Sequence, residues 1–348
     1  MTGSRDPSVP PARPTLEMVA AEAGVSRGTA SRALGDHGNV SPAARKAVLA
    51  AAQAVGYRPN LAARSLARGR SGTVGLIVSE STDRLFNDPF FPQIARGAHR
   101  TLSARGLQLV LSLSQTPEER TQTVQFAAGH HLDGVLLISV RGGDPLHEAL
   151  VEAGIPVVFC GRVSRERTER GLWWVDADNR GGARLAVGHL AETGRRRIAT
   201  IAGPRDLAVG RDRLAGWRDA LTRSQQDPAA GLVHLGDFSV DSGRTGVHLL
   251  LARHPDIDAV FAASDLMALG ALQGLRDRGR RVPDDVAVVG FDDLPAAACA
   301  EPPLTTVHQP VEAMGRRMAE LLLDTLDNSP GAQPSAVLRT RLIIREST

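Results

Sequence analysis

The stretch TLEMVAAEAGVSRGTASRAL, residues 15–34, decides how the first part of the chain folds. Thr15 is a good N-cap for a short helix, and Gly24 ends that helix. Ser26 then caps a second short helix, which Gly35 ends. Two short helices joined by a tight turn that contains glycine predict a helix-turn-helix.

A third helix and a marginal fourth helix follow. Ser41 provides an N-cap before Pro42 at the first helical position, and the apolar helical pattern after them ends at Gly56. The first part of the chain is therefore expected to form a compact three-helix unit. The stretch 61–67, capped by Asn60, is expected to be helical only where something packs against it, because isolated helices below about 12 residues are marginal in water.

Positive charge is concentrated at the N-terminal end of the chain. Residues 1–70 hold ten Lys and Arg against four Asp and Glu, a net charge of +6, whereas the remaining residues hold 31 against 34, a net charge of −3. Association with nucleic acid depends on such local charge. Charge alone fits an ordinary solvated face equally well, so the residue pattern has to separate the two interpretations.

Composition excludes several classes of protein. No run approaches the roughly 18 uninterrupted apolar residues of a membrane-spanning helix, and the Pro-rich first fourteen residues lack the apolar core of a secretory signal. The two cysteines, Cys160 and Cys299, are too few for a disulfide framework or a thiolate metal site. We therefore expect a cytoplasmic protein without a membrane partner, a bound metal or a cofactor.

From Thr73 onward, short apolar runs alternate with stretches of helical pattern. The runs occupy residues 74–78, 107–113, 135–138, 157–159, 198–201, 259–262 and 286–289. Such runs are typical of buried parallel strands, and the amphipathic stretches between them suit the helices of βαβ crossovers. A segment of this length exceeds one comfortable core, which predicts two α/β subdomains with a cleft between them.

The second helix of the helix-turn-helix carries candidates for DNA contact. Helical geometry places Arg27, Gly28 and Ser31 near one face at its N-terminal end, from which base edges are read in the major groove. Arginine there can make a bidentate contact to guanine. The candidates for phosphate contact are Thr15, Ser26, Thr29, Arg32, Asn39 and Ser41. The alternative is that Ser26 is only a helix cap and Arg32 only a surface charge.

The order of these residues strongly resembles the lactose-repressor (LacI/GalR) family of bacterial transcription regulators. The resemblance is carried by Thr15-Leu16-x-x-Val19-Ala20-x-x-Ala23-Gly24-Val25-Ser26-x-x-Thr29-x-Ser31-Arg32-x-Leu34, then by Val40-Ser41 and Gly56-Tyr57-x-Pro59-Asn60. It continues through residues 62–67 and through motifs at 87–91, 213–217, 264–270, 288–293 and 303–307. Only the tail before about Arg13 lies outside it.

The resemblance implies that residues 61–67 are the hinge helix of the family. This helix pairs with its copy in a homodimer and enters the minor groove at the centre of a pseudo-palindromic operator, with Asn60, Ala63 and Leu66 as its contact residues. Leu66 matches the wedge leucine of the family, and apolar wedges kink DNA by partly unstacking a base step. The alternative is a core leucine, but its polar and charged neighbours leave little apolar surface to bury it.

The resemblance also implies that the second part has a fold of the periplasmic binding-protein type, with a ligand in the cleft at the carboxyl ends of the strands. Arg213 matches the ligand-gripping arginine of the family, Asp292 supplies a carboxylate after a strand, and Phe238 matches an aromatic residue that stacks on the ligand. The expected effector residues are Phe90, Phe91, Arg213, Phe238, Ser264, Asp265 and Asp292. Gly161 replaces an acidic residue common in the family, which removes one expected acceptor.

These residues also have purely structural interpretations. The aspartates at 292 and 293 would cap the segment that follows them, and the phenylalanines at 90 and 91 would belong to the core. Arg213 would pair with Asp237 or Asp241 on the surface.

Motifs for catalysis are missing from the sequence. The chain has no GxxxxGK phosphate loop, no GxSxG elbow and no HExxH pair. His130-His131 is expected to be a helix end, because no third metal ligand is placed by spacing. Asp265, Asp292 and Asp293 would suit an acidic catalytic cluster, but binding a sugar requires the same residues. We therefore expect no enzyme and assign no catalytic residue.

Together these interpretations predict a helix-turn-helix domain of three helices with a hinge helix, followed by an α/β core of two doubly wound subdomains. The expected segments are a tail at 1–13, the DNA-binding domain at 14–59, a hinge and linker at 60–70, and the core at 71–348. Within the core, one subdomain comprises 71–174 with 308–330, and the other comprises 175–307 with 331–348. The strand-like stretch at 338–344 has no apolar heptad after it, which argues against a coiled-coil tetramer.

The expected function is a sequence-specific transcriptional repressor that binds double-stranded DNA as a homodimer and responds to a small metabolite, a sugar or sugar derivative. An activator or a corepressor-dependent repressor that senses a nucleobase or another metabolite is an alternative, because the sign of coupling depends on the state that the ligand prefers. A sugar-binding protein is a further alternative, but it would have no use for residues 15–67.

Overall fold

The computed structural model describes residues 14–35, 40–58, 70–162, 172–228, 230–331 and 333–348. The chain divides into two compact units, Met1–Ser71 and Gly72–Thr348, which we call the helical unit and the α/β unit. None of the helices in the described ranges combines the length and the apolar character that a membrane span requires.

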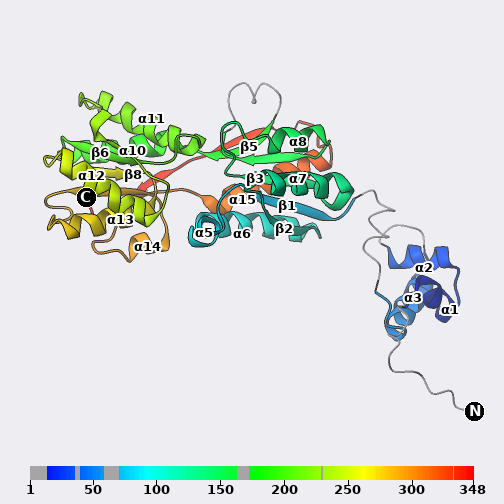
Figure 1. Cartoon of the computed structure of the whole chain (residues 1–348). Helices are drawn as coiled ribbons and strands as arrows, with labels where there is room; N and C mark the ends of the chain where they lie inside the picture. The colour runs from blue at the N-terminus through cyan, green and yellow to red at the C-terminus, as the bar shows by residue number, and fades with distance from the viewer. Residues whose placement is uncertain (1–13, 36–39, 59–69, 163–171, 229, 332) are drawn as a thin grey trace, which may run out of the picture. The chain divides into compact units, whose positions relative to one another are not determined.

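The helical unit contains α1 (Leu16–Glu22), α2 (Arg27–Leu34) and α3 (Pro42–Ala54), shown at the blue end of Figure 1. Thr15, Ser26 and Ser41 cap these helices as predicted, because each hydroxyl accepts a hydrogen bond from the backbone N–H three residues later. Gly24 makes the turn between α1 and α2 at a φ of +63°, which strains any residue with a side chain. The predicted three-helix arrangement is therefore confirmed.

A small apolar core holds these helices together. The core includes Val19 of α1, Ala30 of α2 and Val48 of α3. Tyr57, which follows α3, is partly buried against this cluster. The predicted hinge helix at 61–67 lies outside the described residues, as does Asn39.

The described part of the α/β unit is built on two six-stranded sheets. The first has the order β11-β5-β4-β3-β1-β2, and its strand pairs are parallel. Its strands are β1 (Thr73–Val78), β2 (Gln108–Leu113), β3 (Gly134–Ile138), β4 (Val157–Cys160), β5 (Trp173–Ala177) and β11 (Ser335–Leu338). Its helices are α5 (Thr82–Asn87), α6 (Phe90–Ala104), α7 (Pro117–Phe126), the π-helical turn η1 (Ala127–His131), α8 (Leu146–Glu152) and α15 (Val311–Leu326). We call this half the first subdomain.

The second sheet has the order β12-β10-β9-β8-β6-β7 and is parallel except for β12, which runs antiparallel to β10. Its strands are β6 (Ile198–Ala202), β7 (Val233–Leu235), β8 (Ala259–Ala262), β9 (Ala287–Asp292), β10 (Thr305–His308) and β12 (Arg341–Ile343). Its helices are α10 (Asn179–Glu192), α11 (Ala208–Arg223), the 3-10 turn η2 (Ala230–Leu232), α12 (Val240–Arg253), α13 (Asp265–Asp277) and α14 (Pro295–Ala298). This half is the second subdomain.

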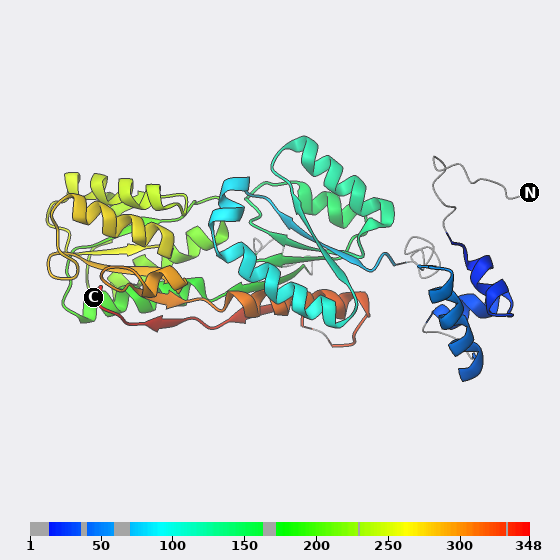
Figure 2. The same cartoon turned by 90° about the horizontal axis from the view of Figure 1, so that it is seen from below.

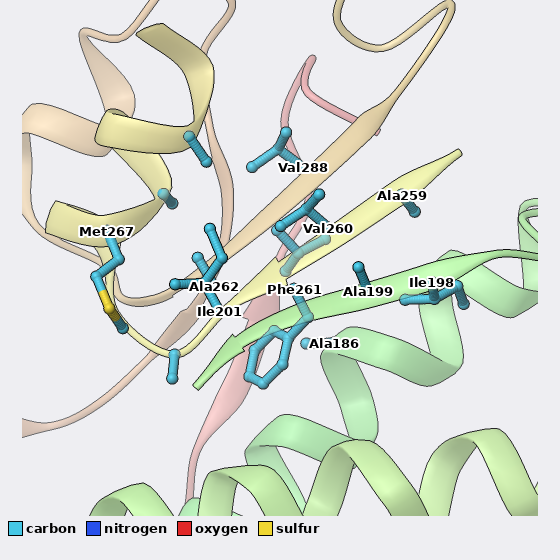
Figure 3. Packing of buried hydrophobic residues seen from close by; sticks show 14 of the residues in the cluster. Ala186, Ile198, Ala199, Ile201, Ala259, Val260, Phe261, Ala262, Met267 and Val288 are labelled. Carbon is cyan, nitrogen blue, oxygen red and sulfur yellow. The ribbon is translucent and has the colours of Figure 1, made fainter. Parts of the chain in front are cut away.

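Helices on both faces explain why the central strands are apolar throughout. In Figure 3, Val260 and Phe261 of β8 point to opposite faces of the second sheet, and Phe261 points towards Ala186 of α10. A parallel strand that is covered on both sides needs apolar residues at every position. The run at 107–113 is predicted to be a buried strand, but β2 lies at the edge of its sheet, and Val110 and Leu111 are 41% and 48% exposed in the chain.

The chain passes from one subdomain to the other between β5 and α10, between β10 and α15, and between β11 and β12. The last passage is visible in Figure 2 as the red C-terminal segment. The predicted single strand at 338–344 is therefore two strands in different sheets. It breaks at residues 339–340, where the Thr340 hydroxyl donates a hydrogen bond to the carbonyl of Asp178 beside the first passage.

The boundaries between the subdomains consequently differ from the predicted ones. Strand β5 keeps residues up to Ala177 in the first subdomain, and β11 adds Ser335–Leu338 to it, whereas the prediction ends that subdomain at 174 and gives all of 331–348 to the other. The sequence pattern did not predict β5 as a strand, because Asp176 interrupts its apolar run. The turn η1 ends at His131, and the residue before it, His130, lies in the left-handed region at a φ of 60°, which agrees with the predicted helix end.

Candidate functional sites

The N-terminal half of α2 presents an exposed polar surface in the helical unit. Arg27, Gly28 and Ser31 are all exposed, as the sequence predicts for residues that read base edges. Arg27 forms an ion pair with Glu17 of α1 at 2.8 Å, but both side chains are more than half exposed. An ion pair so exposed to water contributes little to stability, so Arg27 can exchange Glu17 for another partner at small cost.

Several phosphate candidates already hold hydrogen bonds in the helical unit. The hydroxyls of Thr15, Ser26 and Ser41 cap their helices, and the Thr29 hydroxyl lies 2.9 Å from that of Ser26. The Arg32 Nε donates to the carbonyl of Gly28, and the side chain of Arg32 is exposed among the described residues. The capping role of Ser26 is therefore real, and a contact to phosphate would have to share its hydroxyl.

Gly28 is a glycine that the fold does not require. A Cβ atom at this position would meet only Ser26 Oγ, at 3.9 Å, and the backbone is ordinary right-handed helix. Glycine lowers helix stability relative to alanine. Its presence on the exposed face of α2 therefore fits a surface that another molecule approaches closely.

A cavity of about 360 Å³ lies between the two subdomains of the α/β unit. Residues from the carboxyl ends of strands in both sheets line it. The first sheet contributes Cys160, the last residue of β4, and Asp176 of β5, and the second contributes Asp292 of β9 and Ser264, which follows β8. In parallel α/β sheets this edge is where ligands bind. The volume falls within the range of small-molecule sites.

Arg213 of α11 is the centre of the hydrogen bonds in this cavity. Its side chain is 3% exposed, and its guanidinium donates to Asn179 Oδ1 at 2.9 Å, to the carbonyl of Ala263 at 2.6 Å, to Asp292 Oδ1 at 3.2 Å and to Gln309 Oε1 at 2.6 Å. It also lies 3.6 Å from the centre of the Phe291 ring. The alternative of a surface pair with Asp237 or Asp241 is therefore wrong.

Burial raises the pKa of three carboxyl groups that line the cavity, those of Asp88, Asp176 and Asp292. Burial raises the pKa of Asp292 to about 8, with Arg213 acting against the shift and the nearby charges of Asp265 and Asp88 adding to it. Burial likewise raises the pKa of Asp176 to about 6, and Arg162, whose Nε lies 3.4 Å from its Oδ2, opposes that shift. Carboxyl groups shifted in this way by burial in a cleft are typical of binding and catalytic sites.

An aromatic side chain forms one wall of the cavity. Phe238 is 5% exposed and adopts a φ of 70°, a conformation that an L-residue rarely adopts. Its ring lies directly against Gly203, where an added Cβ would come within 2.3 Å of the ring. Phe90 lines the same cavity from α6. An apolar plate beside hydrogen-bonding groups suits a ring with polar edges.

The structure brings together five of the seven predicted effector residues: Phe90, Arg213, Phe238, Ser264 and Asp292. Phe91 does not line the cavity, because it packs edge-on against Phe90 and belongs to the core of the first subdomain. Asp265 does not line it either. Its carboxylate accepts hydrogen bonds from the Leu294 N–H and the Thr306 hydroxyl, which ties α13 to the segments after β9 and in β10.

Sequence reasoning missed Asp176, Asn179 and Gln309, which line the cavity together with Asp88 and Arg84. Asn179 and Gln309 stand at two of the passages between subdomains, and Asn179 also donates to Asp176 Oδ1 at 2.9 Å. A carboxylate within the apolar run WWVDA was the signal available for Asp176. The passages themselves gave no such signal, since they depend on the whole topology.

Comparison with known proteins matches both units. Residues 15–60 match the family model described as bacterial regulatory proteins, lacI family, and residues 187–348 match a periplasmic binding protein-like domain. The HTH-type transcriptional regulator CelR of Thermobifida fusca is 51% identical over 335 residues, which cover 96% of this chain and 98% of that protein.

Two solved structures extend this similarity to the fold. A complex of the transcriptional regulator CelR with cellobiose is 49% identical to this chain, with a TM-score of 0.77, and the match covers 97% of this chain and all of that one. A lac repressor dimer bound to operator and the anti-inducer ONPF is 30% identical, with a TM-score of 0.86, over 97% of this chain and 99% of that one.

Proposed function

The chain belongs to the lacI family of bacterial regulatory proteins, and from that premise we propose that its α/β cavity binds a neutral carbohydrate that controls operator binding. As a member of this family the chain is a DNA-binding transcriptional regulator and not an enzyme. Because its work requires chromosomal DNA, we propose the cytoplasm as its location.

The buried network around Arg213 carries the effector proposal. Sugar hydroxyls both donate and accept hydrogen bonds, so they need donors and acceptors fixed around one ring. The Arg213 guanidinium supplies donors in a rigid fork, and the carboxyl groups of Asp292 and Asp176 supply acceptors on two sides of the same cavity. Phe238 supplies an apolar plate for a sugar face.

Cellobiose is the first effector to test. The structure of CelR in complex with this disaccharide is similar to the present chain over almost its whole length. We propose that the cavity of this chain takes a disaccharide of the same kind, with one glucose unit beside Arg213 and Asp292. Ser264, at the N-terminus of α13, completes the polar lining on that side.

We further propose that the chain binds DNA as a homodimer through the exposed face of α2. Arg27, Gly28 and Ser31 would read base edges in the major groove, and the predicted phosphate contacts would flank them. The proposed minor-groove residues Asn60, Ala63 and Leu66 lie outside the described residues. Two copies of the helical unit would then require a pseudo-palindromic operator.

Operator binding with and without sugar tests this function. Fragments bound from genomic DNA identify the operator, and fluorescence anisotropy then gives its dissociation constant at increasing cellobiose. We expect cellobiose to change operator affinity at least fivefold, and operator to change cellobiose affinity by the same factor, because coupling between two binding sites is reciprocal. The direction of the change distinguishes an inducer from a corepressor.

A variant in the cavity wall separates the two halves of the proposal. Phe238→Ala should bind the operator like the wild type and lose the response to cellobiose. If cellobiose and related sugars neither bind nor change operator affinity in the wild type, the carbohydrate proposal is wrong, whereas the assignment to the family stands.

A further inference from the structure

A second chamber adjoins the effector cavity on the side of the first subdomain. It measures about 760 Å³ and shares Arg84, Asp88, Arg141 and Phe238 with the first cavity. Three of its other lining residues follow the carboxyl ends of further strands: Ser79 after β1, Gln115 after β2 and Asp237 after β7. The two chambers therefore form one crevice along the edge where ligands of parallel sheets bind.

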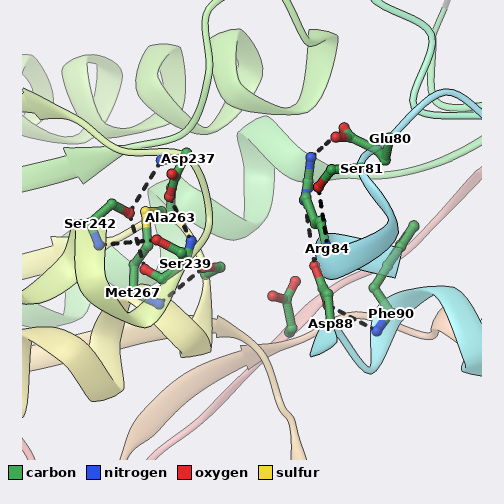
Figure 4. Close-up of polar contacts among 12 residues, drawn as sticks. Glu80, Ser81, Arg84, Asp88, Phe90, Asp237, Ser239, Ser242, Ala263 and Met267 are labelled. Atoms are coloured by element: carbon green, nitrogen blue, oxygen red, sulfur yellow. Dashed lines mark hydrogen bonds and ion pairs between the residues drawn. The ribbon is translucent and has the colours of Figure 1, made fainter. Parts of the chain in front are cut away.

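Arg84 and Phe238 stand at the boundary between the chambers. The Arg84 guanidinium lies 4.8 Å from the centre of the Phe238 ring, so a residue of the first subdomain stacks on one of the second. Arg84 is also held by the Glu80 carboxylate, as Figure 4 shows. Arg141 pairs with both Glu80 and Asp206 and crosses between the subdomains beside this boundary. The boundary is thus made of side chains and not of backbone.

Two polar atoms at the second chamber have no partner within the described residues. Ser79 is 7% exposed, and its hydroxyl makes no hydrogen bond in that part of the chain, although its backbone N–H donates to the carbonyl of Ile138. The Arg84 Nε is likewise without a hydrogen bond there, since Asp88 Oδ2 lies 3.9 Å away. Buried polar atoms are costly without partners, so these two mark places that a ligand oxygen would fill.

The charges of the chamber favour a neutral ligand over an anionic one. Five acidic residues line it against three arginines: Glu80, Asp83, Asp88, Asp144 and Asp237 against Arg84, Arg120 and Arg141. Most of the arginine charge is already neutralised, because Glu80 and Asp144 pair with these guanidinium groups. An anion would meet net negative charge, whereas hydroxyl groups would find donors and acceptors.

We propose that this chamber is a second sugar subsite, which takes the unit of an oligosaccharide effector farthest from Arg213. This inference rests on the proposed function, because it extends the same carbohydrate site. The Ser79 hydroxyl and the Arg84 Nε donate to oxygens of that distal unit. Arg84 and Phe238 flank the linkage between the units, and they set the length of effector that the protein accepts.

Ser79→Ala is the variant that tests the subsite. Its hydroxyl holds nothing in the described structure, so its removal should not lower the melting temperature of the free protein and should raise it if anything, because the cost of the unpaired hydroxyl is relieved. Ser114→Ala is the matched control, since the Ser114 hydroxyl is also buried with no hydrogen bond to any described residue, and Ser114 lines neither chamber. Binding of cellobiose and cellotriose to the full-length protein is measured by titration calorimetry, and that of glucose by competition.

We expect Ser79→Ala to weaken binding of the longest sugar that the wild type accepts by roughly two- to tenfold, the effect of one hydrogen bond. Binding of glucose should be unchanged, and Ser114→Ala should match the wild type with every sugar. Equal affinity of Ser79→Ala and wild type for all three sugars would exclude the chamber as a subsite while the proposed function stands. An equal loss for glucose would also exclude it. If no sugar binds the wild type, the proposed function itself fails and the subsite with it.

Discussion

The helical unit and the effector cavity assemble their functional residues in opposite ways. In the described helical unit the side-chain hydrogen bonds join residues three or four positions apart, as between Ser26 and Thr29 or between Arg32 and Gly28, and the ion pair of Arg27 with Glu17 spans only ten positions. In the cavity, Arg213 reaches partners that lie 34 to 96 positions away along the chain. The first site is presented by local helix geometry, and the second exists only when both sheets are complete.

This difference separates recognition from stability in the two units. Exposed side chains on a preformed helix can change without disturbing the fold, because surface contacts contribute little. A buried cation with four protein partners is part of the fold as well as of the site, because each partner would be left unsatisfied without it. Substitutions in the two regions should therefore affect different measurements.

The largest expected effect is at Arg213. Arg213→Met keeps most of the side-chain volume but removes every donor from Asn179, Asp292 and Gln309. We expect the unfolding free energy of the α/β unit to fall by about 3–5 kcal/mol, because several buried acceptors lose their hydrogen bonds and each unsatisfied buried group costs about 1–3 kcal/mol. Urea unfolding followed by tryptophan fluorescence measures it, since all three tryptophans, Trp173, Trp174 and Trp217, lie in this unit.

The matching substitution in the helical unit is Arg27→Ala. Its ion pair with Glu17 is largely exposed, so the same unfolding curve should change by less than about 0.5 kcal/mol. Operator affinity should fall instead. If Arg213→Met left the stability of the α/β unit intact, the network would serve the ligand alone and the contrast between the units would disappear.

A smaller effect is expected from pH. Burial raises the pKa of Asp292 to about 8 in the folded chain, whereas an unfolded aspartate titrates near 4. The folded chain therefore holds a proton that the unfolded chain has released, so this contribution to stability is complete below about pH 4 and is lost as pH rises through 8. Its slope reaches about 1.4 kcal/mol per pH unit.

The window from pH 6.5 to 8 covers the titration of Asp292 and lies above that of Asp176. Burial raises the pKa of Asp176 only to about 6, so this carboxyl group has already released most of its protons there. Wild-type stability should decline across this window in denaturant unfolding, and Asp292→Asn should show a flatter profile. A variant that declined as steeply as the wild type would place the titrating group elsewhere.

The fold was largely predictable because its signals are local. Capping hydroxyls at Thr15, Ser26 and Ser41 and glycine at 24 mark the helices of the helical unit, and continuous apolar runs mark strands that are covered on both faces. Strand β5 was not predicted, because its apolar run contains Asp176. The assignment of β11 to the first sheet depends on pairing with β5, a contact over more than 150 residues that no local pattern encodes.

The site was predictable to the extent that a residue's role follows from its own motif. Arg213, Phe238 and Asp292 stand in motifs that carry the family resemblance or beside them, and the structure brings them together. Asp265 shares such a motif but turns to Leu294 and Thr306 instead, because it lies one position beyond the cavity-facing Ser264 at the start of α13. The role of Gln309 could not be predicted, because this residue reaches the cavity from the passage between β10 and α15, and that passage is defined only by the complete fold.

The smallest expected effect has opposite signs in two measurements and tests the exposed surface of α2 directly. Gly28→Ala should stabilise the helical unit by up to about 1 kcal/mol, because alanine favours helix and the added Cβ meets only Ser26 Oγ at 3.9 Å. Hydrogen exchange of the amides in α1–α3 measures that gain. Operator affinity should nevertheless fall, because the methyl group projects from the face that we propose reads the bases. A gain in stability with unchanged operator affinity would remove Gly28 from the DNA interface and leave Arg27 and Ser31 to define it.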